Sequence, residues 1–316
     1  MTGHPAARKI WFEQFEPIGA YPKIFRASLG QHLNDRHASS IPMPRTPLVV
    51  GLIKKTFKAR FSLARATIKH ELFKKIVDRI MFKGDKIFFL PRDKVIAINQ
   101  DVNTLPESIA VPSRVVDHFI DQASVHVVMD KCICRDAARC KDYPIGLGCL
   151  FMGEAASRIS PAIGHRVTKA EAKVHVKKCR EAGLVHLIGK NKLDTVWLNA
   201  RPGEKLLTVC NCDPCCCLWR MLPDLPLDIA RKVTRMPGIS VVVSDRCNGC
   251  GTCTSGTCFV DAVHLASGKA VIDQQKCRGC GRCAERCPNH AIDVVISDDR
   301  FIDAAIESLG QVVDLR

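Results

Sequence analysis

Two runs of cysteines near the C-terminus have the spacing of iron–sulfur ligands. In the first run, two-residue gaps separate Cys247, Cys250 and Cys253, and a fourth cysteine follows at Cys258. The second run has the same gaps and ends in a Cys-Pro pair; its members are Cys277, Cys280, Cys283 and Cys287. Gaps of this length let three thiolates on one tight loop face a single 4Fe–4S core. The fourth thiolate cannot fold back onto that core, so it reaches a neighbouring one.

The spacing therefore predicts two 4Fe–4S clusters that exchange their fourth ligands. The predicted ligands of cluster one are Cys247, Cys250, Cys253 and Cys287. The predicted ligands of cluster two are Cys277, Cys280, Cys283 and Cys258. This exchange ties the two halves of the segment together and keeps the clusters close, as electron transfer between them requires.

A third group of cysteines opens with a Cys-x-Cys pair. Its four members lie within eighteen residues and are Cys132, Cys134, Cys140 and Cys149. Such density favours a third iron–sulfur cluster, with a structural zinc ion or redox-active thiols as the alternatives. Arg135 follows the second thiol, where it either donates hydrogen bonds to cluster sulfur, raising the potential, or forms a surface ion pair.

A fourth group is denser still. It places five thiols within eight residues, at Cys210, Cys212, Cys215, Cys216 and Cys217. These cannot all ligate a core already served by the third group. Either they form a further cluster completed by the isolated Cys179, or ligands of both groups mix and leave spare thiols for redox or substrate chemistry. Simple buried packing is the alternative for Cys179 and for each member of the 215–217 run.

Composition and length describe a folded intracellular protein. The chain has 316 residues, of which 47% are hydrophobic, enough for two or three cores. Eighteen cysteines spaced as metal ligands, together with an N-terminus without an apolar signal core, predict a reducing cytoplasmic location. The apolar runs are too short to span a bilayer.

The net charge of +15 is concentrated toward the N-terminus. Two bound clusters would lower it to roughly +11, and a third to roughly +9. Residues 45–94 contain fourteen Lys/Arg against four Asp/Glu, whereas from Ile239 onward there are eight against ten. Apolar residues recur at helical spacing across 54–82, between the basic ones. This helix either packs on its own protein or docks the chain on an acidic partner or the inner face of a membrane.

Four regions follow from these patterns, and together they predict an α+β fold. Residues 1–105 hold an N-terminal arm, the basic amphipathic helix, and a hairpin from 86–90 and 94–99. Residues 106–220 form a cysteine-rich α/β module, in which a helix at 112–123 precedes a buried strand at 125–129. Residues 221–238 read as a linker with a short helix. Residues 239–316 form the two-cluster domain, with paired strands at 240–244 and 291–296 and a final helix.

Within the cysteine-rich module, one stretch is typical of a winged helix. A capping box of Thr168 and Glu171 opens a helix that Gly183 ends. A hairpin of 184–188 and 195–198 is expected to follow. The basic charge and this outline are weak signs of nucleic-acid binding, which we do not expect. The histidines lack metal-ligand spacing and are expected to pack or face solvent.

Residues 239–297 resemble the two-cluster 4Fe–4S bacterial ferredoxins. The chain departs from that pattern by one extra residue between Cys253 and Cys258, and by Phe259 in place of proline. Residues 111–220 resemble a wider set of multi-cluster proteins through Cys-x-Cys-Arg at 132–135, Gly-Leu-Val-His at 183–186 and the cysteine run at 210–217. Asp213 stands where that run usually has another cysteine. The resemblance implies electron carriers of anaerobic metabolism.

The sequence thus predicts an electron-transfer protein, or a subunit of an oxidoreductase, more than a stand-alone enzyme. It would relay single electrons through two clusters and one or two more, to or from a flavoprotein, hydrogenase-type or other oxidoreductase partner. The alternative is an anaerobic reductase whose active site is the 132–217 module. No nucleotide-binding glycine motif is present, so no cofactor besides the clusters is expected.

Overall fold

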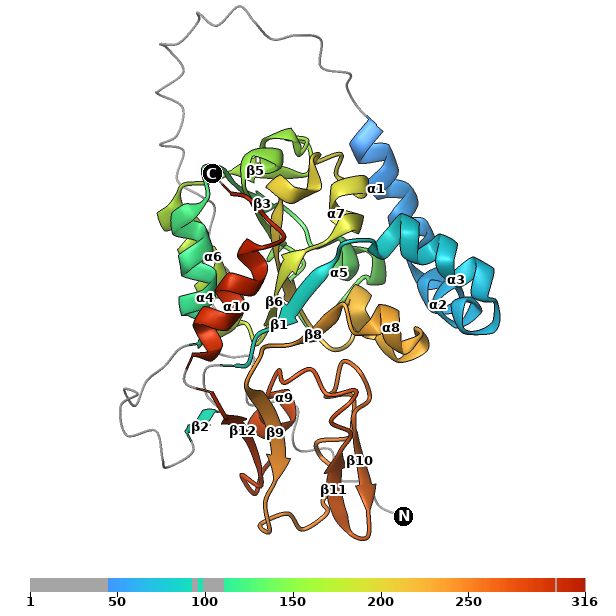
Figure 1. The fold of residues 1–316 in the computed structure, drawn as a ribbon, viewed down its shortest axis with the longest axis vertical. Helices are drawn as coiled ribbons and strands as arrows, with labels where there is room; N and C mark the ends of the chain where they lie inside the picture. The colour runs from blue at the N-terminus through green and yellow to red at the C-terminus, as the bar shows by residue number, and fades with distance from the viewer. Residues whose placement is uncertain (1–44, 93–95, 99–110, 299, 316) are drawn as a thin grey trace, which may run out of the picture. The chain divides into compact units, whose positions relative to one another are not determined.

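A mixed sheet of seven strands organises most of the chain, in the order β5-β3-β4-β7-β6-β1-β8 (Figure 1). The computed structural model describes residues 45–92, 96–98, 111–298 and 300–315. All neighbours in the sheet are antiparallel except β1 and β8, which run parallel. The strands are β1 (Lys86–Phe89), β3 (His126–Met129), β4 (Leu150–Met152), β5 (Gly164–Arg166), β6 (Val185–Lys190), β7 (Leu207–Cys212) and β8 (Val233–Arg235).

Side chains of the central strands alternate between two hydrophobic clusters, one on each face of the sheet. In β1, Phe88 belongs to the first cluster, whereas Ile87 and Phe89 belong to the second. In β6, Ile188 belongs to the first and Leu187 to the second. Both faces are therefore covered, and neither can be a free surface.

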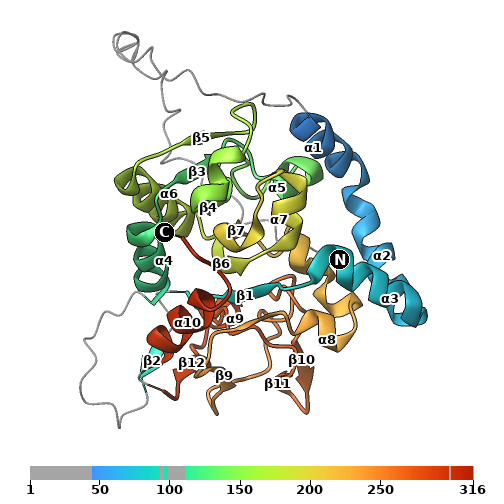
Figure 2. The ribbon, with the colours of Figure 1, turned by 45° about the horizontal axis from the view of Figure 1, so that its top comes forward.

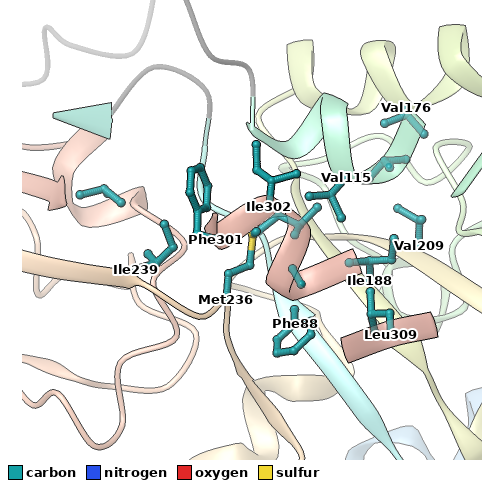
Figure 3. Packing of buried hydrophobic residues seen from close by; sticks show 14 of the residues in the cluster. Phe88, Val115, Val176, Ile188, Val209, Met236, Ile239, Phe301, Ile302 and Leu309 are labelled. Atoms are coloured by element: carbon teal, nitrogen blue, oxygen red, sulfur yellow. The ribbon is translucent and has the colours of Figure 1, made fainter. Parts of the chain in front are cut away.

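Three helices pack on the first face: α4 (Val111–Gln122), α6 (Lys169–Glu181) and α10 (Phe301–Gly310). Figure 3 shows Val115 of α4, Val176 of α6 and Leu309 of α10 gathered around Ile188. Val115 and Leu309 are fully buried. Because α10 and the following Val313 and Leu315 are buried in this cluster, the C-terminal segment is tied to this sheet by apolar packing.

The opposite side carries a chain of short helices, as Figures 1 and 2 show. These are α1 (Arg45–Thr56), η1 (Phe57–Ala59), α2 (Arg60–Lys69), α3 (Glu71–Val77) and the π-helical turn η2 (Asp78–Phe82). Phe57, Val77 and Phe82 contribute to the second cluster, together with Trp219 of η5 (Leu218–Asp224). The remaining helical elements are α5 (Ile133–Ala138), η3 (Glu154–Arg158), α7 (Lys192–Trp197), η4 (Gly203–Lys205), α8 (Leu227–Ala230) and α9 (Arg282–Glu285).

The C-terminal segment adds two small sheets. β12 (Ile292–Ile296) pairs antiparallel with β9 (Ile239–Val243) and parallel with β2 (Ile96–Ile98). β10 (Val263–Ala266) and β11 (Lys269–Ile272) form a hairpin between the two cysteine runs. The fold is thus mixed α and β. The ferredoxin-like segment contains strands β9 to β12, and β2 joins its sheet from the N-terminal side of the chain.

Several sequence predictions are confirmed. Helix α4 and the buried strand β3 lie where the hydrophobic pattern placed them. The Thr168–Glu171 capping box forms in both directions and opens α6. The pair β9 and β12 and the final helix α10 are also observed. Among the described residues, no helix is both long and apolar enough to cross a membrane.

Other predictions are corrected. The strands expected to form a hairpin at 86–90 and 94–99 join different sheets, because β1 pairs with β6 and β8 whereas β2 pairs with β12. The single helix expected over 54–82 is divided, since His70 adopts an extended backbone conformation. The second strand of the expected winged-helix hairpin is the helix α7, because Asn191 caps it by accepting a hydrogen bond from the backbone N–H of Leu193 at 3.0 Å.

Residues 221–238, expected as a linker, carry η5, α8 and β8 and contribute buried side chains such as Leu222 and Val233. The N-terminal arm expected within residues 1–47 lies almost entirely outside the described residues. The described residues from Arg45 onward belong to one compact unit.

The buried Asp85 before β1 predicts a pH-dependent stability. One carboxylate oxygen accepts the backbone N–H of Lys192 at 2.7 Å, and burial raises the pKa of Asp85 to about 7. Between about pH 4 and pH 7 the folded chain therefore holds a proton that the unfolded chain has lost, so stability falls as pH rises. The melting temperature of Asp85→Asn minus that of the wild type should increase from about pH 5.5 to pH 7 and then remain constant. The exposed Asp303→Asn is the control, and a gap independent of pH would contradict this account.

Candidate metal centres

All eighteen cysteines are free thiols, and seventeen of them form four groups in space. Site A consists of Cys247, Cys250, Cys253 and Cys287. Site B consists of Cys258, Cys277, Cys280 and Cys283. Site C consists of Cys132, Cys134, Cys149, Cys210, Cys212 and Cys217. Site D consists of Cys140, Cys215 and Cys216 together with Asp213.

Site A gathers three thiols of the first cysteine run and the last thiol of the second. Its cavity is closed by apolar side chains, including Leu265 and Ile292. The backbone N–H of Ala270 donates to the Sγ of Cys247, and that of Ala291 donates to the Sγ of Cys287, both at 3.3 Å. Backbone donors aimed at sulfur stabilise negative charge on a thiolate.

Glycine is required within the site A loop. Gly249 adopts a φ of +72°, and a Cβ there would lie 2.2 Å from the carbonyl oxygen of Gly268 in the β10–β11 turn. The loop and the hairpin therefore approach each other so closely that any side chain would push them apart. This contact sets the position of the neighbouring Cys250.

Site B has the complementary composition, with Cys258 of the first run joining three thiols of the second. Its wall includes Phe259, whose ring meets Phe89 of β1 edge-on at 5.3 Å between centroids. Here the residue that replaces the usual proline anchors site B to the large sheet. The backbone N–H of Ala262 donates to the Sγ of Cys258 at 3.3 Å, and burial raises the pKa of Cys280 to about 12.

Strand alternation creates half of site C. Cys210 and Cys212 are two residues apart on β7 and therefore face the same side of the sheet, toward the second hydrophobic cluster. The intervening Asn211 faces the other side, where its Oδ1 lies 2.7 Å from Nδ1 of His186, its partner across β6. The alternation of the strand therefore puts Cys210 and Cys212 on the face that carries the candidate ligands, and Asn211 on the opposite face.

The other thiols of site C come from three separate segments. Cys132 precedes α5, Cys134 lies within its first turn, Cys149 precedes β4, and Cys217 precedes η5. Trp219 and Phe151 are among the apolar residues that enclose the cavity. The structure therefore mixes the third and fourth cysteine groups around one cavity.

The thiols of site C can ionise only if a positive charge lies close to them. Hydrogen bonds with neighbouring thiols, followed by burial, raise the pKa values of Cys134, Cys149 and Cys212 well above the ordinary thiol value. Six thiols so close together and so shielded cannot all become thiolates unless a cation compensates them. A metal core supplies that charge, and four of the six thiols are enough to hold a 4Fe–4S cluster; the four-thiol sets of sites A and B fit such a cluster without spare ligands.

Cys140 lies apart from the set in which the sequence placed it. Cys132, Cys134 and Cys149 line site C, whereas the Sγ of Cys140 lies 3.6 Å from the Sγ of Cys215 in site D. The reason is local, because α5 ends at Ala138 and Arg139 adopts a left-handed conformation that turns the chain away.

The buried Arg135 separates sites C and D. It is 0% exposed, and its guanidinium donates to the carbonyl oxygens of Pro144 at 2.9 Å, Asn211 at 2.7 Å and Leu147. It also forms an ion pair with Asp213 at 3.2 Å. The expected surface ion pair is wrong, because both Arg135 and Asp213 are buried; the arginine ties the two cysteine-bearing loops together.

Sequence reasoning missed one acidic residue of site C and included one thiol that lies outside the sites. Asp194 lines the site C cavity, and burial, followed by the neighbouring Cys210, raises its pKa well above the ordinary value. Cys179 lines none of the four sites; it is buried on α6 with its Sγ 3.6 Å from Nε2 of His175. His175 and His186 pack inside the protein, as expected of histidines without ligand spacing.

Comparison with known families identifies one segment. A model of the 4Fe-4S binding domain family matches residues 270–293, which contain Cys277, Cys280, Cys283 and Cys287. This confirms the predicted ferredoxin-type segment, and the chain accordingly carries at least one 4Fe–4S cluster site. Comparisons with curated proteins and with solved structures gave no match.

Paired glycine substitutions test the geometry of site A. Both Gly249 and Gly256 have positive φ, but a Cβ at Gly256 meets nothing within 4 Å. Each alanine variant carries a backbone penalty of about 1–2 kcal/mol, and only Gly249→Ala adds a clash. We expect Gly249→Ala to lose about four irons per chain, one cluster's worth, and Gly256→Ala to keep them. Iron analysis of anaerobically purified protein measures this, with circular dichroism as the folding check; equal losses would contradict it.

Proposed function

We propose that this protein transfers single electrons through three iron–sulfur clusters, held at sites A, B and C. The observation that carries the proposal is the position of site B. Cys258 and Cys277 of site B pack against both hydrophobic clusters of the fold. The first cluster also contains Cys253 and Cys287 of site A, and the second contains Cys212 and Cys217 of site C. Side-chain packing is thus continuous from site A through site B to site C.

A short covalent and hydrogen-bonded path also supports coupling of sites B and C. Cys217 of site C is followed by Trp219, whose backbone N–H donates to the Cys217 Sγ at 3.4 Å. The next residue, Arg220, donates from Nη1 to the carbonyl oxygen of Cys258 in site B. When bound, the clusters supply the one-electron carriers. The chain's contribution is to fix the ligands, exclude water with apolar walls and connect the sites.

Metal analysis tests this proposal. We expect about twelve irons and twelve sulfides per chain, four for each cluster. Cys212→Ser should lower iron to about eight and leave the signals of the ferredoxin-type segment in electron paramagnetic resonance unchanged. Cys179→Ser, a thiol outside the sites, is the matched control. Eight irons in the wild type, unchanged in Cys212→Ser, would restrict the clusters to sites A and B.

The helices at 54–82 would supply the docking surface for the proposed redox partner, a flavoprotein or hydrogenase-type subunit. Four large apolar side chains along α2–η2 are 47–74% exposed, which favours docking over packing on the chain itself; they are Ile68, Leu72, Ile76 and Ile80. Exposed lysines such as Lys69 and Lys75 lie among them. A mixed basic and apolar surface of this kind suits an acidic protein surface or an anionic bilayer.

Charge reversal tests the docking surface. Lys69→Glu combined with Lys75→Glu should weaken binding to an acidic redox protein or to anionic vesicles by tenfold or more at low salt, because each change replaces attraction by repulsion. Lys178→Glu, exposed on α6, is the control. Binding measured by sedimentation that is equal in all three proteins would rule out this surface.

A second candidate function is reduction of a small substrate beside site B. A cavity of about 510 Å³ is lined there by Arg92 and Lys177, which pair with Glu285 and Glu181, and by His186. The backbone N–H of Arg92 donates to the carbonyl oxygen of Cys280 at 3.1 Å, so the cavity wall directly adjoins site B. A volume of this size suits a small ligand. Oxidation of the reduced protein by a small-molecule substrate, slowed by Lys177→Ala while the iron content is unchanged, would favour this reductase activity over a pure electron relay.

A further inference from the structure

Site D is a separate group of ligand atoms beside site C. It joins Cys140, which follows α5, to a tight turn after β7 that carries Asp213, Cys215 and Cys216. The Sγ of Cys215 lies 3.6 Å from that of Cys140, 2.9 Å from that of Cys216 and 2.9 Å from Oδ1 of Asp213. All four ligand atoms lie within 4.8 Å of one another.

This spacing suits one ion and not a cluster. Tetrahedral zinc with sulfur at about 2.3 Å places neighbouring ligand atoms about 3.8 Å apart. The three separations from the Cys215 Sγ are 2.9–3.6 Å, and none among the four atoms exceeds 4.8 Å, so a single ion at the centre reaches all four atoms after small outward side-chain adjustments. A 4Fe–4S core instead needs thiols that approach four different iron atoms from outside.

The carboxylate of Asp213 is held in place before any ion binds. Its Oδ1 accepts the backbone N–H groups of Cys215 at 3.0 Å and of Cys216 at 2.7 Å. Its Oδ2 pairs with the buried Arg135 at 3.2 Å. Outer contacts of this kind fix the orientation of a metal-binding carboxylate. Asp213 is 1% exposed, whereas Cys215 is exposed and leaves a path for an ion to enter.

We propose that site D binds one zinc ion, with Cys140, Cys215 and Cys216 as thiolate ligands and Asp213 as the fourth. Thiolates with one carboxylate, in a tetrahedral arrangement, match the ligand preferences of zinc. The ion cross-links the loop after α5 to the turn after β7. Cys212 and Cys217 of site C flank that turn directly, but they are held by β7 and by the start of η5, so they keep their positions without the ion.

Metal analysis and zinc X-ray absorption on untagged, EDTA-washed, anaerobically purified protein test the proposal. We expect one zinc per chain, with three sulfur neighbours at about 2.3 Å and one oxygen at about 2.0 Å. Cys140→Ser and Cys216→Ser should lose most of the zinc and keep wild-type iron, whereas the control Cys179→Ser should keep both.

Asp213→Cys replaces the carboxylate ligand by a thiolate and so keeps the number of ligands at four. Zinc should be retained and its absorption spectrum should change to four sulfur neighbours without oxygen. Three outcomes overturn the proposal: no zinc in the wild type, a Cys215–Cys216 disulfide found by mass spectrometry instead of zinc, or loss of iron together with Cys140. Loss of iron in Cys140→Ser would assign these thiols to a cluster. The iron bound at sites A and B would be unaffected, so the proposed function would still be tested separately.

Discussion

The structure depends on a conflict between burial and charge at its cysteines. Sulfur binds metal as thiolate, yet burial raises the pKa of Cys280 to about 12 and that of Cys283 higher still. Backbone N–H groups directed at Cys247, Cys258 and Cys287 compensate part of this cost. The rest requires a cationic core, because the buried Arg278 and Arg282 beside site B are too few to neutralise four thiolates inside apolar walls. Metal binding and folding of these loops are therefore coupled.

Arginines fasten the ferredoxin-type segment to the large sheet. Arg282 donates to the carbonyl oxygen of Gly183 at 2.7 Å and to the hydroxyl of Tyr143 at 2.8 Å. Arg278 donates to the carbonyl oxygen of Ala230 at 3.2 Å, and Arg220 reaches that of Cys258. Each guanidinium stays charged and offers several donors, so one side chain can join distant backbone segments. These contacts surround site B, which is the site that adjoins both others.

The sequence predicted ligands that lie close together along the chain, but it did not predict which ligands from distant segments would meet. Ligands on one loop, such as Cys277 and Cys280, follow from spacing, and the family comparison confirms the segment that contains them. Site C needs pairing of β4 with β7 to bring Cys149 near Cys210, and no local pattern specifies that pairing. Arg139 adopts a left-handed backbone conformation, and the turn it makes removes Cys140 from site C. An arginine at this position does not predict that conformation. Helical periodicity likewise could not show the break at His70.

The central claim is that sites A, B and C form one set of electron carriers. Anaerobic coulometric reduction of the wild-type protein measures this most directly, because it counts electrons regardless of how the iron is distributed. Each cluster accepts one electron, so the account predicts an uptake of about three electrons per chain. An uptake of two would leave site C without a cluster and contradict the account.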